Sequence, residues 1–155
     1  REKDGQKLQI KWLTYPSRQE LPLLAESAQA TLKDIGIDVD INCTADNNSV
    51  VQDPAAWDVY AMANVQAPTG DPEYWFTVFA TSDATKNQLE EQLSQEFDTD
   101  KRAKLAVEMQ QTVLDDNAFV YCSFLKMSQI SRANVTGYTA HACDYYQVTA
   151  DLDIN

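Results

Sequence analysis

The sequence predicts an α/β domain built on a mostly parallel sheet. Two short apolar runs, residues 8–13 and 37–41, flank a segment with helical periodicity, and a third apolar run follows at residues 58–63. A strand, a helix and a second strand over this length form a βαβ unit, which is parallel and right-handed. We therefore expect a central sheet with helices on both faces, and a single domain over residues 1–155.

The first strand and helix follow from two different periods. In residues 8–13, Leu8, Ile10 and Trp12 alternate with polar residues, as in a strand with one buried face. The helix is expected from about Leu21 to Ile35, with Gly36 as its stop. Its apolar positions recur at three- and four-residue steps and form one face: Leu21, Leu24, Ala28, Leu32 and Ile35.

The second and third strands bracket a polar stretch. Residues 37–41 alternate apolar and acidic side chains, and residues 44–53 should hold a loop with one helical turn around Ser49–Gln52. The third strand, 58–63, follows Trp57, which we expect to anchor it by packing. Because ligands bind beyond the carboxyl ends of strands in open α/β sheets, the loop after Ala63 is a candidate site.

A helix start follows that loop. Asp71 precedes Pro72, and Asp at the N-cap with Pro at the first helical position is a strong initiation signal. We therefore assign Asp71 to capping and not to ligand contact. The aromatic residues after it are expected to pack against the sheet, although Trp75 could also line a pocket.

Two more helices and an apolar strand are expected downstream. Leu89, Leu93 and Phe97 lie four residues apart and predict an amphipathic helix over 87–97. Residues 101–114 predict a second helix, whose apolar line includes Met109 as a core residue. Residues 119–124 predict a central strand, and residues 127–131 predict its continuation or an edge strand. Residues 135–138 predict a short turn or strand, and we expect the tail after them to be loosely ordered.

Composition excludes several classes of function. Twelve Lys and Arg against twenty-four Asp and Glu give a net charge of −12, which disfavours nucleic acid and an anionic membrane surface. No apolar run approaches the roughly 18 residues of a membrane span. The chain opens REKDGQK, without Met or a signal peptide, so we expect it to be either a fragment or a mature, processed form.

The cysteines and the single histidine give little support to catalysis. Cys43 and Cys122 lie in or beside apolar runs and are expected to be buried and inert. Cys143, two residues after His141, leaves a small thiol enzyme as an alternative, but that spacing alone does not make the two side chains face each other. No phosphate-binding, dinucleotide-binding or nucleophile-elbow motif is present. We therefore predict no enzyme, no catalytic residue, no cofactor and no metal ligands.

Three stretches resemble the carboxyl-terminal lobe of peptide/nickel-class ABC-transporter solute-binding proteins (extracellular solute-binding protein family 5). LQIKWLTYPSRQELPLLAESAQATLKDIGIDVDI resembles the family's strand, tyrosine loop, long helix, L-K-x-I-G-I-x-V turn and strand. WDVYAMANVQAPTGDPEYWF resembles its ligand loop and aspartate-proline helix start. KRAKLAVEMQQTVLDDNAFVYCSFLKMSQISRANVTGY resembles its R-x-x-L-Y-x-x-x-Q helix and closing V-x-G turn, with Ala106 in place of the usual tyrosine.

The resemblance implies one lobe of a periplasmic-binding-protein-like (type II) fold, from about residue 8 to residue 138. Such proteins have two lobes that close on a solute, and they deliver peptides or chelated nickel to a membrane permease. The implied partners are therefore a small solute, the permease subunits and an amino-terminal lobe of the same protein, without nucleic acid. The implied location is periplasmic or extracellular, with a lipoprotein anchor in Gram-positive bacteria.

The candidate site combines the strand ends and the loop. Its predicted ligand-binding residues are Tyr15, Asn64, Gln66, Pro68, Thr69, Gly70 and Trp75. Tyr15 could instead only cover the sheet edge. Peptide binders of the family carry an aspartate at the position of Pro68, so the charge that pairs with a peptide amino group is missing. Peptide, nickel chelate and another solute all stay open, as does an interaction module that binds no small ligand.

Overall fold

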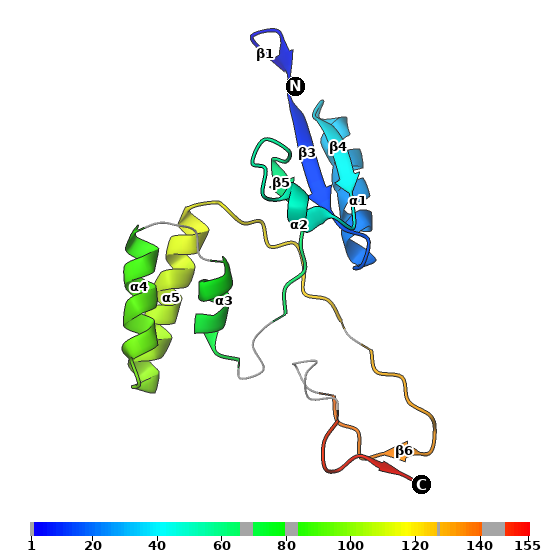
Figure 1. The fold of residues 1–155 in the computed structure, drawn as a ribbon, viewed down its shortest axis with the longest axis vertical. Helices are drawn as coiled ribbons and strands as arrows, with labels where there is room; N and C mark the ends of the chain where they lie inside the picture. Colours follow the sequence, from blue (N-terminus) through cyan, green and yellow to red (C-terminus); the bar gives the residue numbers. More distant parts are fainter. Residues whose placement is uncertain (1, 66–69, 80–83, 127, 141–147) are drawn as a thin grey trace. The chain divides into compact units, whose positions relative to one another are not determined.

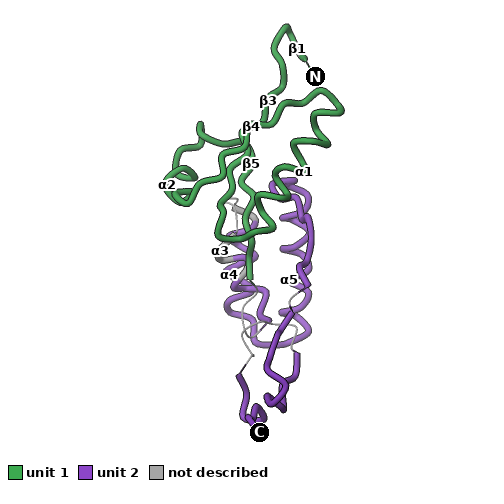
Figure 2. Tube along the Cα trace, turned by 90° about the vertical axis from the view of Figure 1, so that its right-hand side faces the viewer, with its two compact units in different colours: residues 1–65 green, residues 66–155 purple. Residues whose placement is uncertain are grey.

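The computed structural model describes residues 2–65, 70–79, 84–126, 128–140 and 148–155; within these ranges the side chains of residues 3, 75, 77–79, 84 and 85 are left out. The chain divides into two compact units, Arg1–Val65 and Gln66–Asn155, which Figure 2 draws in different colours. We describe each unit by itself. The single domain expected over residues 1–155 stays a prediction.

The first unit is built around a three-stranded parallel sheet of order β4-β3-β5. The central strand β3 (Gln9–Thr14) pairs along its whole length with β4 (Asp38–Cys43) and more briefly with β5 (Val59–Tyr60). Helix α1 (Glu20–Asp34) connects β3 to β4 and lies along them (Figure 1). The predicted βαβ unit and the α/β class with a parallel sheet are therefore confirmed.

Helix α1 ends as the sequence predicts. Gly36 has a φ of 77°. Its N–H donates to the Lys33 carbonyl at 2.9 Å, and the Ile37 N–H donates to the Leu32 carbonyl at 3.0 Å. This pair of bonds is the Schellman pattern, which satisfies carbonyls that the helix itself leaves unpaired. The chain therefore turns directly from α1 into β4.

The core of the first unit lies between α1 and the sheet. Leu21 and Ala25 on the helix are buried, whereas Ile35, which the sequence places on the same face, is 49% exposed. The buried residues of this unit come from α1, β3, β4 and the end of β5: Leu13, Thr14, Leu21, Ala25, Val39 and Ala61. Burial of these apolar side chains is the main stabilising term for the unit.

Two short elements complete the first unit. Strands β1 (Glu2–Lys3) and β2 (Gln6–Lys7) form an antiparallel hairpin. Its turn residues Asp4 and Gly5 have φ values of 54° and 78°, the positive values that type I′ turns require. Helix α2 (Asn47–Val50) is the helical turn expected in the polar stretch, two residues earlier than predicted.

The described part of the second unit contains three helices, which lie side by side (Figure 1): α3 (Pro72–Phe79), α4 (Ala84–Gln95) and α5 (Thr99–Asp115). They bury one apolar cluster made by Phe76, Leu89, Leu93, Ala106, Met109 and Val113. Asp98 caps α5 by accepting hydrogen bonds from the N–H groups of Asp100 and Lys101. The predicted core role of Met109 is confirmed, since it is 0% exposed.

Two sequence predictions in this unit are wrong. Helix α4 ends at Gln95, and Phe97 is 91% exposed instead of lying on the apolar face. The stretch from Phe119 to Phe124 forms no strand, and neither do the described residues of 127–131; Val120 and Phe124 are 86% and 95% exposed. An apolar run becomes a strand only when a neighbouring strand accepts its backbone hydrogen bonds, and none does so here among the described residues.

The described part of the tail is more regular than expected. Strand β6 (Val135–Thr136) pairs antiparallel with β7 (Asp153–Ile154). Gly137 follows β6 with a φ of 73°, and a Cβ atom there would lie 1.7 Å from the Asp151 carbonyl oxygen. Only glycine permits both this backbone conformation and this approach. Within the described ranges, no helix has the length and apolar character to cross a membrane.

Candidate functional site

Tyr15 lies directly after β3, at the carboxyl edge of the first unit's sheet. Its hydroxyl oxygen accepts a hydrogen bond from the Ala63 N–H at 3.1 Å. Nearby, the buried Thr14 hydroxyl donates to the Ala61 carbonyl at 3.4 Å. Tyr15 therefore fixes the backbone just before Asn64, where the candidate loop begins, while its own hydroxyl proton is available to donate.

A second tyrosine at the same edge was missed by the sequence analysis. The Tyr60 ring centroid lies 6.4 Å from that of Tyr15 and 6.1 Å from that of Trp57. Asn47 donates from its side-chain amide to the Tyr60 hydroxyl at 2.7 Å, and Trp57 donates from its indole N–H to the Val51 carbonyl at 3.1 Å. The anchoring role expected of Trp57 is confirmed. The place of Tyr60 at the end of β5 is the signal that could have identified it.

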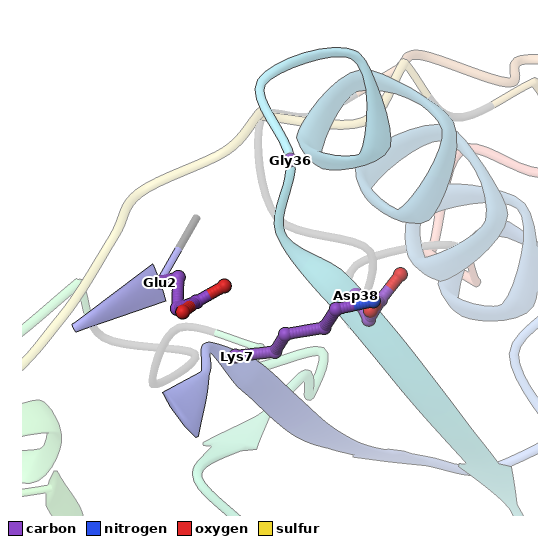
Figure 3. A pocket seen from close by; sticks show the side chains of 4 residues that line it. All are labelled: Glu2, Lys7, Gly36 and Asp38. Atoms are coloured by element: carbon purple, nitrogen blue, oxygen red, sulfur yellow. The ribbon is translucent and has the colours of Figure 1, made fainter. Parts of the chain in front are cut away.

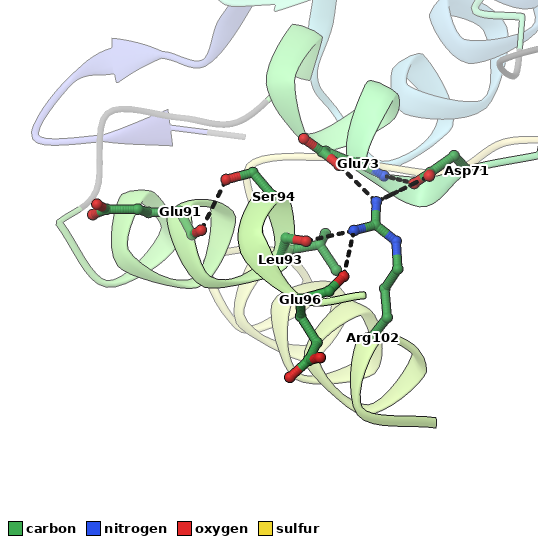
Figure 4. Close-up of polar contacts among 7 residues, drawn as sticks. All are labelled: Asp71, Glu73, Glu91, Leu93, Ser94, Glu96 and Arg102. Atoms are coloured by element: carbon green, nitrogen blue, oxygen red, sulfur yellow. Dashed lines mark hydrogen bonds and ion pairs between the residues drawn. The ribbon is translucent and has the colours of Figure 1, made fainter. Parts of the chain in front are cut away.

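In the second unit, Asp71 performs the predicted capping role. Its Oδ1 atom accepts from the Glu73 N–H at 3.0 Å, immediately before α3. The same carboxylate binds Arg102, whose Nη2 atom lies 2.8 and 2.9 Å from the two Asp71 oxygens (Figure 4). Nη2 also lies 2.6 Å from Oε2 of Glu73. The helix start therefore carries two carboxylates that share one guanidinium.

The hollow drawn in Figure 3 does not match the predicted site. It is lined by Glu2, Lys7, Gly36 and Asp38. Asp38 is the first residue of β4, so the hollow lies at the amino end of that strand, whereas Tyr15 follows the carboxyl end of β3. Its charges are of both signs. We do not assign a ligand to it.

The described residues offer no group of three or more His, Cys, Asp or Glu side chains that could hold a metal ion. His141 and Cys143 lie outside the described residues. Cys43 and Cys122 are free thiols and both are exposed, so the prediction that they are buried is wrong. Cys43 is the last residue of β4, where it pairs with Thr14 of β3 and is still exposed, and Cys122 belongs to the run that forms no strand.

Comparisons with known proteins point to one class of transport protein. No protein-family profile matches the chain. A stretch of 81 residues, 52% of the chain, is 32% identical to the nickel-binding protein NikA of Staphylococcus aureus, of which it covers 16%. The solved structure of S. aureus NikA in complex with Ni(L-His)2 matches 71% of the chain with a TM-score of 0.64 and 27% identity. The chain is therefore similar in sequence and in fold to part of this nickel-binding protein.

A second solved structure supports the same assignment. The nickel ABC transporter protein of Bacillus halodurans matches 75% of the chain with a TM-score of 0.66 and 29% identity. The chain spans 26% of the length of each of these two solved chains. The family resemblance and the periplasmic-binding-protein-like fold are thereby confirmed. The homologues are nickel-binding and transport proteins, so the prediction that the chain is not an enzyme is confirmed as well.

The predicted solute-binding residues are only partly described. Tyr15 is half-buried, and Asn64 and Gly70 are exposed. Gln66, Pro68 and Thr69 lie outside the described residues, as does the side chain of Trp75. The structure brings Tyr15 into contact with Ala63, the neighbour of Asn64. A shared site for all seven residues stays a prediction.

The charges at the start of α3 affect each other's protonation. The hydrogen bond from Arg102, followed by the backbone N–H of Glu73, holds the pKa of Asp71 below its ordinary value of 3.8. In return, hydrogen bonds to Glu73 and Asp71 raise the pKa of the Arg102 guanidinium. Asp71 and Arg102 are therefore both ionised at neutral pH, which keeps the ion pair between them intact.

The lowered pKa of Asp71 predicts a pH-dependent contribution to stability. A carboxyl with a lower pKa in the folded state stabilises the fold above its unfolded pKa, and this contribution disappears as pH falls through the folded value. We expect Asp71→Asn to lower the melting temperature near pH 6, and the gap to wild type to narrow below about pH 3.8. Thermal unfolding followed by circular dichroism measures this gap. When both proteins also carry Arg102→Met, the difference in melting temperature that Asp71→Asn causes should depend little on pH. If the difference between Asp71→Asn and the wild type is the same at every pH, the prediction is wrong.

Proposed function

We propose that this chain is the carboxyl-terminal lobe of the solute-binding protein of an ABC importer, and that its solute is nickel held by a small chelator. The single observation that carries the proposal is the match to two nickel-class proteins, at 27% and 29% identity, one of them solved with Ni(L-His)2. The protein would work in the periplasm or outside the cell, as a lipoprotein in Gram-positive bacteria, and would deliver its solute to the permease subunits.

One feature of the chain favours a nickel chelate over a peptide, and a second is consistent with a metal that brings its own ligands. Pro68 occupies the position at which peptide binders of the family carry an aspartate, so the partner for a peptide amino group is missing. In addition, no cluster of metal-ligating side chains occurs in the part of the chain that the structure describes. Both features suit a metal whose ligands come mainly from its own chelator.

The residues of the proposed site would orient such a chelate by hydrogen bonds and cover it with aromatic surface. Because the Tyr15 oxygen already accepts from Ala63, its proton can be donated to a carboxylate of the chelator. Asn64, Gln66 and Thr69 would add polar side chains, and Gly70 would present its backbone. Pro68 and Trp75 would supply apolar surface. No bond of the solute is made or broken by these residues.

Calorimetric titration of the full-length protein tests the proposal. The probes are nickel(II) with two equivalents of L-histidine and, as the competing solute, trialanine. We expect micromolar or tighter binding of the nickel–histidine complex and no binding of trialanine. We expect chain 1–155 alone to bind weakly or not at all, since half of the contacts are absent. Binding of trialanine without nickel–histidine, or micromolar binding by chain 1–155 alone, would contradict the proposal.

A Tyr15→Phe variant tests the role of the hydroxyl. Loss of a hydrogen bond to a charged group weakens binding by about 1.5–3 kcal/mol, which corresponds to roughly 10- to 150-fold in Kd. Tyr138→Phe is the matched control, because Tyr138 is also half-buried and lies outside the proposed site. Equal affinities of the two variants would exclude Tyr15 from the site.

A further inference from the structure

Arg102 joins the three helices of the second unit. It lies in the first turn of α5, and its guanidinium binds Asp71 and Glu73 at the start of α3. Its other terminal nitrogen, Nη1, donates to the backbone carbonyls of Leu93 and Glu96, at the end of α4 (Figure 4). The side chains of Arg102, Asp71 and Glu73 are 22%, 40% and 33% exposed, so these bonds stay partly accessible to water.

The place of Arg102 is not explained by its own helix. A cation in the first turn of a helix faces the positive end of the helix dipole, which is unfavourable. The contacts with the other two helices are favourable, because carbonyls at the end of α4 lack partners within that helix and the two carboxylates carry opposite charge. Arg102 therefore acts mainly on α3 and α4 and not on α5.

The contact with Asp71 reaches the edge of the proposed site. Gly70, one of the proposed solute-binding residues, is exposed, has a φ of 70° and would have open space around a Cβ atom. The planar peptide bond between Gly70 and the next residue couples the backbone direction of Gly70 to that residue. That neighbour, Asp71, is held by two bonds from Arg102 and by the Glu73 N–H.

We infer that Arg102 is a positioning residue for solute binding: through Asp71 it fixes the backbone of Gly70 in the orientation that meets the solute. This inference rests on the proposed function. Arg102 itself would touch no solute. Its planar guanidinium is suited to this role because it can bind a carboxylate and backbone carbonyls at once, which the single ammonium of Lys does less well.

The test compares four variants of the full-length protein. Arg102→Met removes the charge, and Arg102→Lys keeps the charge but loses the planar guanidinium that binds several acceptors at once. Glu73→Gln weakens the neighbouring contact and leaves the Asp71 bonds in place. Val113→Ala removes buried volume from the same helical cluster, where Val113 is 2% exposed, without touching Asp71. Each variant is measured for melting temperature, for the Kd of nickel(II) with two equivalents of L-histidine, and for NMR-detected amide exchange of Gly70 and Glu73 without solute.

A positioning role predicts a specific pattern across these measurements. At a temperature where every variant is folded, Arg102→Met should raise Kd about tenfold and speed the exchange of both amides. Arg102→Lys should recover part of both effects, and Glu73→Gln should change Kd less than twofold. Val113→Ala should lower the melting temperature and leave Kd unchanged.

Two results would overturn the inference. The first is an Arg102→Met variant that matches Val113→Ala in both Kd and amide exchange, since this would make the residue merely structural. The second is unchanged exchange of Gly70 in Arg102→Met. If wild-type protein binds no nickel–histidine complex, the proposed function fails, and the exchange of Gly70 alone then decides whether Arg102 orients this backbone.

Discussion

Phe76→Ala is expected to lower the free energy of unfolding of the helical unit by about 3–5 kcal/mol. Phe76 is 1% exposed, and among the described side chains of α3 it is the one that joins the cluster with α4 and α5. Truncation removes its buried apolar area and leaves a cavity that the surrounding side chains fill only in part. Urea denaturation followed by far-ultraviolet circular dichroism measures the change as a shift of the midpoint.

Phe97→Ala is the matched control for this prediction. It makes the same chemical change at a side chain that is 91% exposed, so its effect should stay within about 0.5 kcal/mol. Similar losses for both variants would show that α3 does not pack through Phe76. A large loss for Phe97 alone would reverse the assignment of core and surface and support the helix face that the sequence predicts.

The second large effect is expected at the ion pair between Lys86 and Asp116. The Lys86 side chain is 1% exposed, while that of Asp116 is 41% exposed. Removing one partner of a buried pair takes one counter-charge from the other, and the loss of stability is larger when water cannot reach the charge that remains. We expect Asp116→Ala to destabilise the protein by about 3 kcal/mol, because the remaining ammonium is buried.

Substitution of the other partner, Lys86, should lower the free energy of unfolding by less. In Lys86→Met the remaining carboxylate is partly hydrated and the methionine fills most of the volume of the lysine stem, so we expect a loss of about 1 kcal/mol or less. The same urea denaturation gives both values. A Lys86→Met variant that is less stable than Asp116→Ala would contradict the argument from unequal burial.

Local periodicity was sufficient for the βαβ unit and for the positions of the helices, but not for the length of β5, which is Val59–Tyr60 instead of residues 58–63, or for the end of α4. The alternation in residues 8–13 and 37–41, and the Gly36 stop between them, predicted β3, α1 and β4 to within a few residues. In these segments the buried partners lie close along the chain, so a local pattern contains most of the information. The Asp71-Pro72 signal likewise predicted both the start of α3 and the role of its cap.

Strand pairing and long-range contacts could not be predicted from local periodicity. The apolar stretch from Phe119 to Phe124 has the composition of a central strand, but composition does not say whether a neighbouring strand accepts its backbone bonds. Arg102 contacts Asp71 from 31 residues away, and Asn47 reaches Tyr60 from 13 residues away. Neither separation belongs to a helix or strand period, so these contributors to the candidate site were not predicted.

The approach of Gly137 to the backbone at Asp151 has a consequence at the level of the genetic code. The contact is with main-chain atoms, so no side-chain rearrangement could make room for a larger residue. A single-base change in a glycine codon that replaces the glycine by another amino acid always introduces a residue with a Cβ atom. Every such missense mutation would therefore force the main chain at Gly137 and Asp151 apart, and only synonymous changes at this codon would leave the contact between them intact.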